Sequence, residues 1–260
     1  MTRAKGFEAA HRYRDERLGK AARLHGHNFT LTASIAGPID EKTHFVVDFR
    51  GLDAVLADAL APLDHRRLDT EYAALDGRAP STEALADSLF RALAPRMRSR
   101  LGVRLARVRV TEGEDLWSER DEGGNVELTR AYGFSAAHRL ADPGRSDEEN
   151  RRLYGKCANP QPHGHDYRFE VTVSGALDDD TGLIADVGAI DEAVSCRVLQ
   201  AFDHRYLNAE VPPFDRVLPT AERIAERIWS LLAKDVPDLA RVVVYETPRS
   251  AFAYTGIDHE

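Results

Sequence analysis

The sequence contains little sulfur, because only two of its 260 residues are cysteines, Cys157 and Cys196. Two cysteines cannot build a disulfide framework, so the composition excludes that class of secreted protein and favours a reducing cytoplasm. Long hydrophobic runs are also absent. No stretch of 18 or more apolar residues occurs, and the first residues lack the apolar segment of a signal peptide. We therefore expect neither a membrane span nor secretion.

Positive charge is in deficit as well, since 35 Lys and Arg stand against 43 Asp and Glu, a net charge of -8. A protein that binds the phosphate backbone of nucleic acid needs a broad positive surface, so this class of partner is disfavoured. Apolar residues make up 43% of the chain and charged residues 30%, which is typical of a folded globular protein. The length corresponds to roughly 1.7 typical domains, which allows one large or two small ones.

The two halves of the sequence repeat each other in order. Residues 6–12 (GFEAAHR) return as residues 133–139 (GFSAAHR), and residues 25–29 (HGHNF) return as residues 163–167 (HGHDY). Later matches join 47–49 with 185–187, 63–66 with 202–205, 80–83 with 219–222 and 111–112 with 245–246. We predict two tandem domains, residues 1–120 and residues 125–260, joined by a charged linker with two glycines at residues 119–125.

Hydrophobic periodicity predicts the same α+β plan in each half. Alternating apolar residues indicate strands around residues 29–35 and 167–173. Apolar residues three and four apart indicate amphipathic helices around residues 52–60 and 224–232. Each half is therefore expected to be an antiparallel four-stranded sheet with two helices on one face.

Ten histidines form the most informative pattern in the sequence. In each half, two histidines at positions i and i+2 share one strand face about 6.5 Å apart, and a third shares the apolar register of the preceding strand. A single His-x-His is more simply explained by hydrogen bonding in a core, but the duplicated trio favours Zn²⁺ with an open fourth position, one or two ions per chain. The two trios are His11, His25 and His27, and His138, His163 and His165.

These residues resemble the 6-pyruvoyl-tetrahydropterin synthase and 6-carboxy-tetrahydropterin synthase family, whose members have the tunnelling fold, or T-fold. The second half matches the family motifs over residues 134–138, 155–160, 163–167, 202–205, 219–222 and 245–247. The first half matches over residues 9–11, 25–27, 64–65 and 81–83, and at Glu112. The resemblance implies a zinc-dependent lyase that eliminates triphosphate from 7,8-dihydroneopterin triphosphate.

The resemblance implies that Cys157 acts as a general base. It lies six residues before His163, the spacing of the pyruvoyl-type enzymes. We expect Zn²⁺, Lys156 and Arg139 to favour its thiolate form, although an inert small residue is the alternative interpretation. Cys196 is expected in the core or on a neutral surface.

Five further positions in the second half carry over from the family. The resemblance implies that Asp203 and His204 form a second acid-base pair, although an Asp that caps a helix is an alternative. Glu246 would bind the pterin ring through paired hydrogen bonds. Thr220 and Glu222 match the substrate-binding loop, but helix capping explains them equally well.

The first half departs from the family at one position. It has the acid-base pair Asp64 and His65 and the substrate-binding matches Thr82, Glu83 and Glu112, but no cysteine. Three hypotheses remain open: a retired scaffold, a different base on the loop, or composite sites completed together with the second half.

The leading hypothesis is a pyruvoyl-type tetrahydropterin synthase. The alternatives are the carboxy-type reaction of deazapurine biosynthesis, which releases acetaldehyde, a pterin-binding protein without turnover, and a generic zinc hydrolase. The expected partners are a small-molecule pterin and further copies of the chain, in a homo-oligomer with interfacial sites. Candidate triphosphate contacts, which a charged surface loop explains equally well, are Arg139, Arg151, Arg152 and Lys156.

Overall fold

The computed structural model describes residues 1–256 and groups them into two compact units. Unit 1 contains Met1–Thr129 and Ser174–Gly188, and unit 2 contains Arg130–Val173 and the residues from Ala189 onward. The short segment Ser174–Gly188 thus packs with the first half of the sequence, although the repeat assigns it to the second. The domain boundaries 1–120 and 125–260 stay a prediction.

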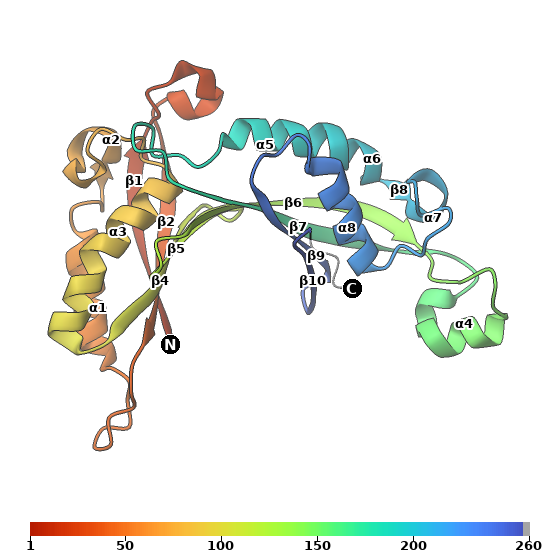
Figure 1. Ribbon diagram of the computed structural model, residues 1–260, viewed down its shortest axis with the longest axis horizontal. Coiled ribbons are helices and arrows are strands. Elements are labelled where there is room, and N and C mark those ends of the chain that lie inside the picture. Colours follow the sequence, from red (N-terminus) through yellow and green to blue (C-terminus); the bar gives the residue numbers. More distant parts are fainter. Residues whose placement is uncertain (257–260) are drawn as a thin grey trace. The chain divides into compact units, whose positions relative to one another are not determined.

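Unit 1 is a sheet with helices along one face (Figure 1). Its long strands pair antiparallel in the order β5-β4-β2-β1, and the two-residue strand β3 pairs with β1 in parallel. The strands are β1 (Thr2–His11), β2 (His25–Ala36), β3 (Arg66–Arg67), β4 (Arg104–Glu112) and β5 (Leu116–Asp121). The helical segments are η1 (Glu16–Ala22), α1 (Phe49–Leu60), α2 (Leu68–Glu71), η2 (Ala73–Leu75), α3 (Thr82–Arg96) and η3 (Met97–Leu101).

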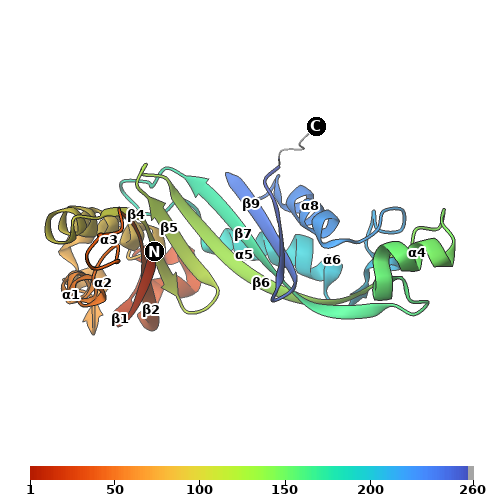
Figure 2. The same ribbon diagram turned by 90° about the horizontal axis from the view of Figure 1, so that it is seen from below.

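Unit 2 repeats this plan, with α5 and α8 along one face of its strands (Figures 1 and 2). The strand order is β6-β7-β9-β10, and β8 pairs with β6 in parallel. The strands are β6 (Val126–His138), β7 (His163–Gly175), β8 (Arg205–Tyr206), β9 (Leu239–Thr247) and β10 (Ser250–Tyr254). The helical segments are α4 (Asp147–Tyr154), η4 (Gly155–Ala158), α5 (Val187–Val194), η5 (Ser195–Leu199), α6 (Gln200–Phe202), α7 (Leu207–Glu210) and α8 (Ala221–Leu232).

The α+β class is confirmed, and the long strands pair antiparallel wherever their register is defined. The prediction of four strands per half is incomplete, because β3 and β8 each add a parallel edge pair. Strands of two residues are too short to show the alternation from which the sequence predicts a strand.

Buried apolar faces hold each sheet and its helices together. Leu52, Val55 and Leu56 of α1 are at most 2% exposed, as their helical spacing predicts. On β2, Phe29 and Leu31 are at most 1% exposed and continue the register of the histidines at the start of that strand. Full burial of such a side chain contributes about 1.5–3 kcal/mol. The core therefore fixes the strand faces that carry the histidines.

The structure describes two connecting segments in more detail than the sequence predicts. The predicted linker 119–125 is the end of β5 followed by a tight turn, in which Gly124 has φ +90° and donates its N–H to the carbonyl of Asp121 at 3.1 Å. The helix α4 was not predicted. It begins with a capping box, in which Ser146 and Glu149 exchange hydrogen bonds, and its short polar sequence hides the helical period.

Candidate metal centres and flanking acid-base pairs

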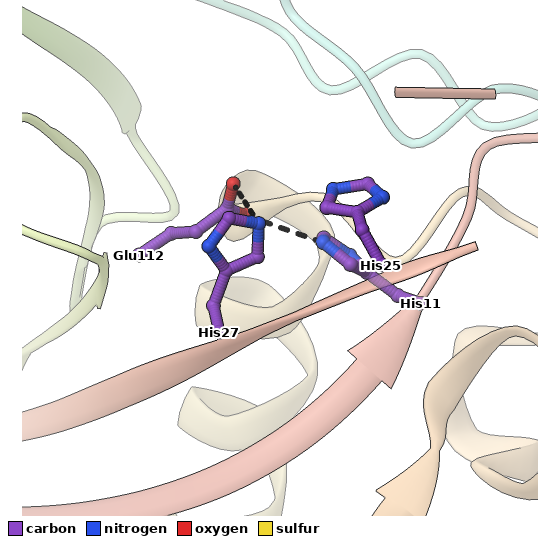
Figure 3. Close-up of side chains that lie close together, drawn as sticks. All are labelled: His11, His25, His27 and Glu112. Carbon is purple, nitrogen blue, oxygen red and sulfur yellow. Dashed lines mark ion pairs between the residues drawn. The ribbon is translucent and has the colours of Figure 1, made fainter. Parts of the chain in front are cut away.

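The first cluster forms where β1 ends and β2 begins. His11 lies opposite His25 in the antiparallel register, and the ring centroids of the trio are 4.5–5.3 Å apart. Glu112 ends β4 and lies opposite Phe29 of β2, which brings its carboxylate to the same place. One donor atom from each of His11, His25, His27 and Glu112 lies within 4.8 Å of the other three (Figure 3).

The second cluster repeats this arrangement at the end of β6 and the start of β7. The ring centroids of its three histidines are 4.6–5.1 Å apart, and Nε2 of His138 lies 3.2 Å from Nε2 of His163. Oε1 of Glu246 lies 3.5 Å from Nε2 of His138 and 3.7 Å from Nε2 of His165. The structure thus brings both predicted trios together.

A backbone carbonyl orients the most buried ring of each cluster. Nδ1 of His11 lies 2.9 Å from the carbonyl oxygen of Pro80, and Nδ1 of His138 lies 2.9 Å from that of Pro219. A carbonyl oxygen only accepts hydrogen bonds, so Nδ1 carries the proton and Nε2 keeps its lone pair for a ligand.

The electrostatics of both clusters suit a bound cation. Burial lowers the pKa of His11 to about 4 and also lowers the pKa values of His27, His138 and His163. These imidazoles are therefore neutral, which is the metal-binding form. Nε2 of His11, His27 and His165 is buried and has no hydrogen-bond partner among the described residues. A divalent metal ion would satisfy these nitrogen atoms.

Cys157 lies in η4, where its carbonyl oxygen accepts the N–H of Leu140 at 2.9 Å. Burial and the Glu246 carboxylate raise the pKa of its thiol. The protein groups by themselves therefore favour the neutral thiol, and the expectation that Zn²⁺, Lys156 and Arg139 together stabilise a thiolate stays a prediction. The guanidinium of Arg139 instead donates to the carbonyl oxygens of Ala158 and Asn159.

The two Asp-His pairs have the same backbone geometry. Oδ1 of Asp64 accepts a hydrogen bond from a β1 backbone N–H at 3.1 Å, and Oδ1 of Asp203 does so from β6 at 2.9 Å. Nδ1 of His65 and of His204 lies 3.0 Å from the neighbouring aspartate oxygen. Both histidines have φ 57°, a left-handed conformation that is uncommon outside glycine and concentrates at functional sites.

These imidazoles face solvent and not the clusters. The side chains of His65 and His204 are 73% and 81% exposed. Each lines an open cleft that also includes one cluster residue, His27 for the first half and His165 for the second. Each pair is therefore accessible from solvent in its cleft.

Thr82 and Glu83 are buried inside unit 1, both 1% exposed. The Thr82 hydroxyl lies 2.7 Å from that of Ser118. Oε1 of Glu83 accepts the N–H of Ile184 at 3.4 Å, and burial raises the pKa of this carboxyl. Segment Ser174–Gly188 thus contacts Glu83 through Ile184, and the predicted substrate contacts of Thr82 and Glu83 stay predictions.

The matching residues of the second half are more open. Thr220 is half-buried and caps α8 by accepting the N–H of Arg223 at 3.5 Å. Glu222 is exposed in the first turn of that helix. The capping interpretation of Thr220 is therefore correct for the backbone, and substrate contacts by these residues stay predictions.

Sequence reasoning missed Tyr13, whose ring lies edge-on to His11 with centroids 5.8 Å apart. Burial and the carboxylates of Glu83 and Glu112 raise its pKa. The register could have revealed it, because Tyr13 follows His11 by two residues. The second half has Leu140 at the matching position.

Comparison with known families gives a match to both halves of the chain. The model of the family described as 6-pyruvoyl tetrahydropterin synthase matches residues 1–122 and again residues 127–257. This double match confirms the tandem duplication and the resemblance predicted from the sequence.

Among curated proteins, human 6-pyruvoyl tetrahydrobiopterin synthase is 40% identical over 141 residues, which cover 52% of this chain and 97% of the human protein. A putative 6-carboxy-5,6,7,8-tetrahydropterin synthase from Archaeoglobus fulgidus is 32% identical over 113 residues, 44% of this chain and 87% of that protein. The solved Caenorhabditis elegans 6-pyruvoyl tetrahydropterin synthase is 34% identical and covers 51% of this chain and 96% of its own, with a TM-score of 0.49.

None of the helices within residues 1–256 is long and apolar enough to cross a membrane.

Proposed function

Since this chain belongs to the 6-pyruvoyl tetrahydropterin synthase family, we propose that it is a zinc-dependent lyase that eliminates triphosphate from 7,8-dihydroneopterin triphosphate. One observation carries the proposal: only the second half combines a histidine trio with a cysteine. Oε1 of Glu246 lies 3.5 Å from Nε2 of His138, and its charge, after burial, raises the pKa of the Cys157 thiol. The enzyme type predicted from the sequence agrees with the names of the relatives.

We propose roles for the second-half residues from their chemistry. His138, His163 and His165 would hold Zn²⁺, which when bound supplies a Lewis acid for the hydroxyl groups of the substrate side chain. Glu246 accepts hydrogen bonds from the ring N–H and amino donors of the pterin. Cys157 takes a proton from the side chain as a general base.

The acid-base pairs would act across a boundary. His204 and His65 are exposed, and each is oriented through Nδ1 by its aspartate, which leaves Nε2 as the atom that would exchange a proton. Nε2 of His65 lies 3.2 Å from the Glu8 carboxylate, so substrate would have to displace that contact. In this proposal Asp64 and His65 serve a Cys157 site supplied by another copy of the chain. In the same proposal Asp203 and His204 would serve a first-half site, which has no thiol.

A homo-oligomer is supported by a contact inside unit 1. There the carbonyl oxygens of Thr181 and Gly182 accept hydrogen bonds from the Ala79 N–H at 2.9 Å and the Ser81 hydroxyl at 2.7 Å. The loop of residues 178–188 from the second repeat is thus seated on the start of α3. A chain of two repeats contains two such loops and two such binding sites. Only one loop is bound within the chain, so one loop and one binding site remain without this contact.

The leftover loop is residues 40–50. It has the same turn, in which one aspartate, Asp40, accepts the N–H groups of Lys42 and Thr43. Ile39 and Phe45 beside this turn are 66% and 54% exposed. We propose that the loop docks at residues 217–222 of a second copy, which is the counterpart of the contact within unit 1. A head-to-tail contact of this kind builds a ring when the rotation between copies closes. His44 stands where the other loop has Gly182, so the two contacts differ in atomic detail.

Product analysis tests the proposed activity. The zinc-loaded chain is incubated with 7,8-dihydroneopterin triphosphate, and triphosphate and acetaldehyde are measured together. The pyruvoyl-type reaction predicts triphosphate without acetaldehyde. Stoichiometric acetaldehyde would establish the carboxy-type alternative, which the Archaeoglobus relative favours. If neither triphosphate nor acetaldehyde forms, the remaining interpretation is a pterin-binding protein without turnover.

We also propose that the protein is cytoplasmic and binds neither nucleic acid nor membranes. Both cysteines are free, and the net charge is -8, as a reduced, acidic enzyme of small-molecule metabolism requires.

A further inference from the structure

Glu112 and Glu246 occupy matching places in the two halves but make different contacts. Glu112 uses both oxygens, because Oε1 lies 3.2 Å from Nε2 of His27 and Oε2 lies 3.8 Å from Nε2 of His11. Glu246 approaches its histidines with Oε1 alone, at 3.5 and 3.7 Å. The Glu112 side chain is also more buried, 11% exposed against 25% for Glu246. Among the described residues, a carboxylate joins the donor group only in the first half.

The surroundings of the first cluster also differ from those of the second. The ring of Tyr13 packs edge-on against His11, where the second half has Leu140. The segment before His25 contains alanines at positions 21 and 22 and no thiol. Figure 3 shows the carboxylate of Glu112 directed toward the three imidazole rings. The Glu112 carboxylate thus occupies the side of the first cluster that faces β4. The first half also has no cysteine that could act as a general base as Cys157 does in the second half.

We propose that Glu112 is the fourth ligand of a divalent metal ion in the first half, where it does not anchor a pterin. Three imidazole nitrogens and one carboxylate oxygen form a set of four protein ligands, and such closed sets are typical of structural zinc sites. The first half then holds a structural metal centre, and the second half keeps an open position for substrate. This inference goes beyond the proposed function and does not depend on lyase activity.

The proposed ligands come from three strands that are distant in sequence. His11 ends β1, His25 and His27 begin β2, and Glu112 ends β4. An ion bound by all three strands would stabilise the folded form of unit 1, since the unfolded chain does not hold these residues together. The metal ion of the first half would then support the enzyme by stabilising unit 1.

Cobalt titration of the full chain tests this assignment. A His163→Ala background weakens the second site, so that Co²⁺ added to chelator-treated protein reports the first site through its visible absorption. Glu112→Gln should weaken Co²⁺ binding at least about tenfold, as loss of a ligand costs no less than loss of a supporting residue. It should also change the absorption band and reduce the rise in melting temperature that Co²⁺ causes. Glu246→Gln in the same background is the matched control and should leave all three readouts unchanged.

A second variant keeps the test informative if Glu112→Gln folds poorly. Glu112→Asp retains the charge but shortens the reach, and its binding should also weaken while the fold persists by circular dichroism. Unchanged Co²⁺ affinity, spectrum and melting shift in both variants would overturn the proposal. So would weaker binding of neopterin to Glu112→Gln with metal binding intact, because that result would assign Glu112 to the pterin. Failure of the lyase assay alone would leave the metal assignment standing.

Discussion

Cys157 is the residue that separates the two halves chemically, because the first half has the histidines and no thiol. Cys157→Ser keeps the size of the side chain but replaces the thiol by a far less acidic hydroxyl. We expect triphosphate release to fall at least about 100-fold, the usual contribution of a general base. Zinc content should not change. Cys196→Ser, on the exposed cysteine of η5, is the control, and an unchanged rate in Cys157→Ser would disprove the assigned role.

Glu246 sets the pH dependence of that base. Burial and, after it, the Glu246 carboxylate raise the pKa of the Cys157 thiol, so the basic thiolate forms, and activity rises, only as the pH increases. Glu246→Gln removes the negative charge and should shift this rising limb of the kcat profile to lower pH. The variant should also bind pterin about 10 to 100 times more weakly, since a hydrogen bond to a charged group is lost. A limb that stays in place would show that Glu246 does not act on the thiol.

At the residue scale, the sequence is sufficient to predict which side chains come together where strand register determines their positions. The convergence of His25 with His27 and of His163 with His165 follows from their spacing on one strand. The different contacts of Glu112 and Glu246 do not, because they depend on how closely β4 and β9 bring each carboxylate to a histidine. The direction of the Cys157 pKa shift was likewise not predictable. It follows from burial and from Glu246, which is distant in sequence, and not from the neighbouring lysine.

At the scale of elements, the start of α3 links the fold to the first cluster. The Ser81 hydroxyl accepts the N–H of Ala84 at 3.1 Å and donates to the carbonyl of Gly182 at 2.7 Å. The preceding carbonyl, that of Pro80, orients His11. Ser81→Ala removes a cap and leaves a buried carbonyl without its donor, so the free energy of unfolding should fall by about 1–3 kcal/mol.

Thr220→Ala is the matched variant for this measurement. Its hydroxyl caps α8 with one longer bond of 3.5 Å and is only half-buried, so the loss should be smaller. Urea-induced unfolding of both variants gives the comparison. Equal losses would mean that the contact with residues 178–188 contributes nothing.

Elements with a clear period were predictable, and those without one were not. The apolar spacing of α1 and α8 and the alternation of β2 and β7 predict their buried faces. The parallel pairs of β3 and β8 and the short helix α4 have no such period. The packing of residues 174–188 against unit 1 could not be predicted from the sequence either, because the repeat suggests that each half packs alone.

At the scale of the whole molecule, the proposed ring depends on the loop of residues 40–50. Phe45→Asp places a charge on an exposed apolar side chain that would be buried against a second copy, which is costly without a partner. We expect sedimentation velocity to show a smaller assembly. Glu41→Gln on the same loop is the control, and an unchanged sedimentation coefficient in Phe45→Asp would place the interface elsewhere.

The central claim is that both halves hold a metal ion but only the metal site of the second half, beside Cys157, binds and converts the substrate. The most direct test is the rate of triphosphate release from 7,8-dihydroneopterin triphosphate by His163→Ala and by His25→Ala, two matched positions of the repeat. We predict that His163→Ala abolishes release, whereas His25→Ala retains most of it at temperatures where the chain remains folded. Loss of activity in His25→Ala with full activity in His163→Ala would contradict the account.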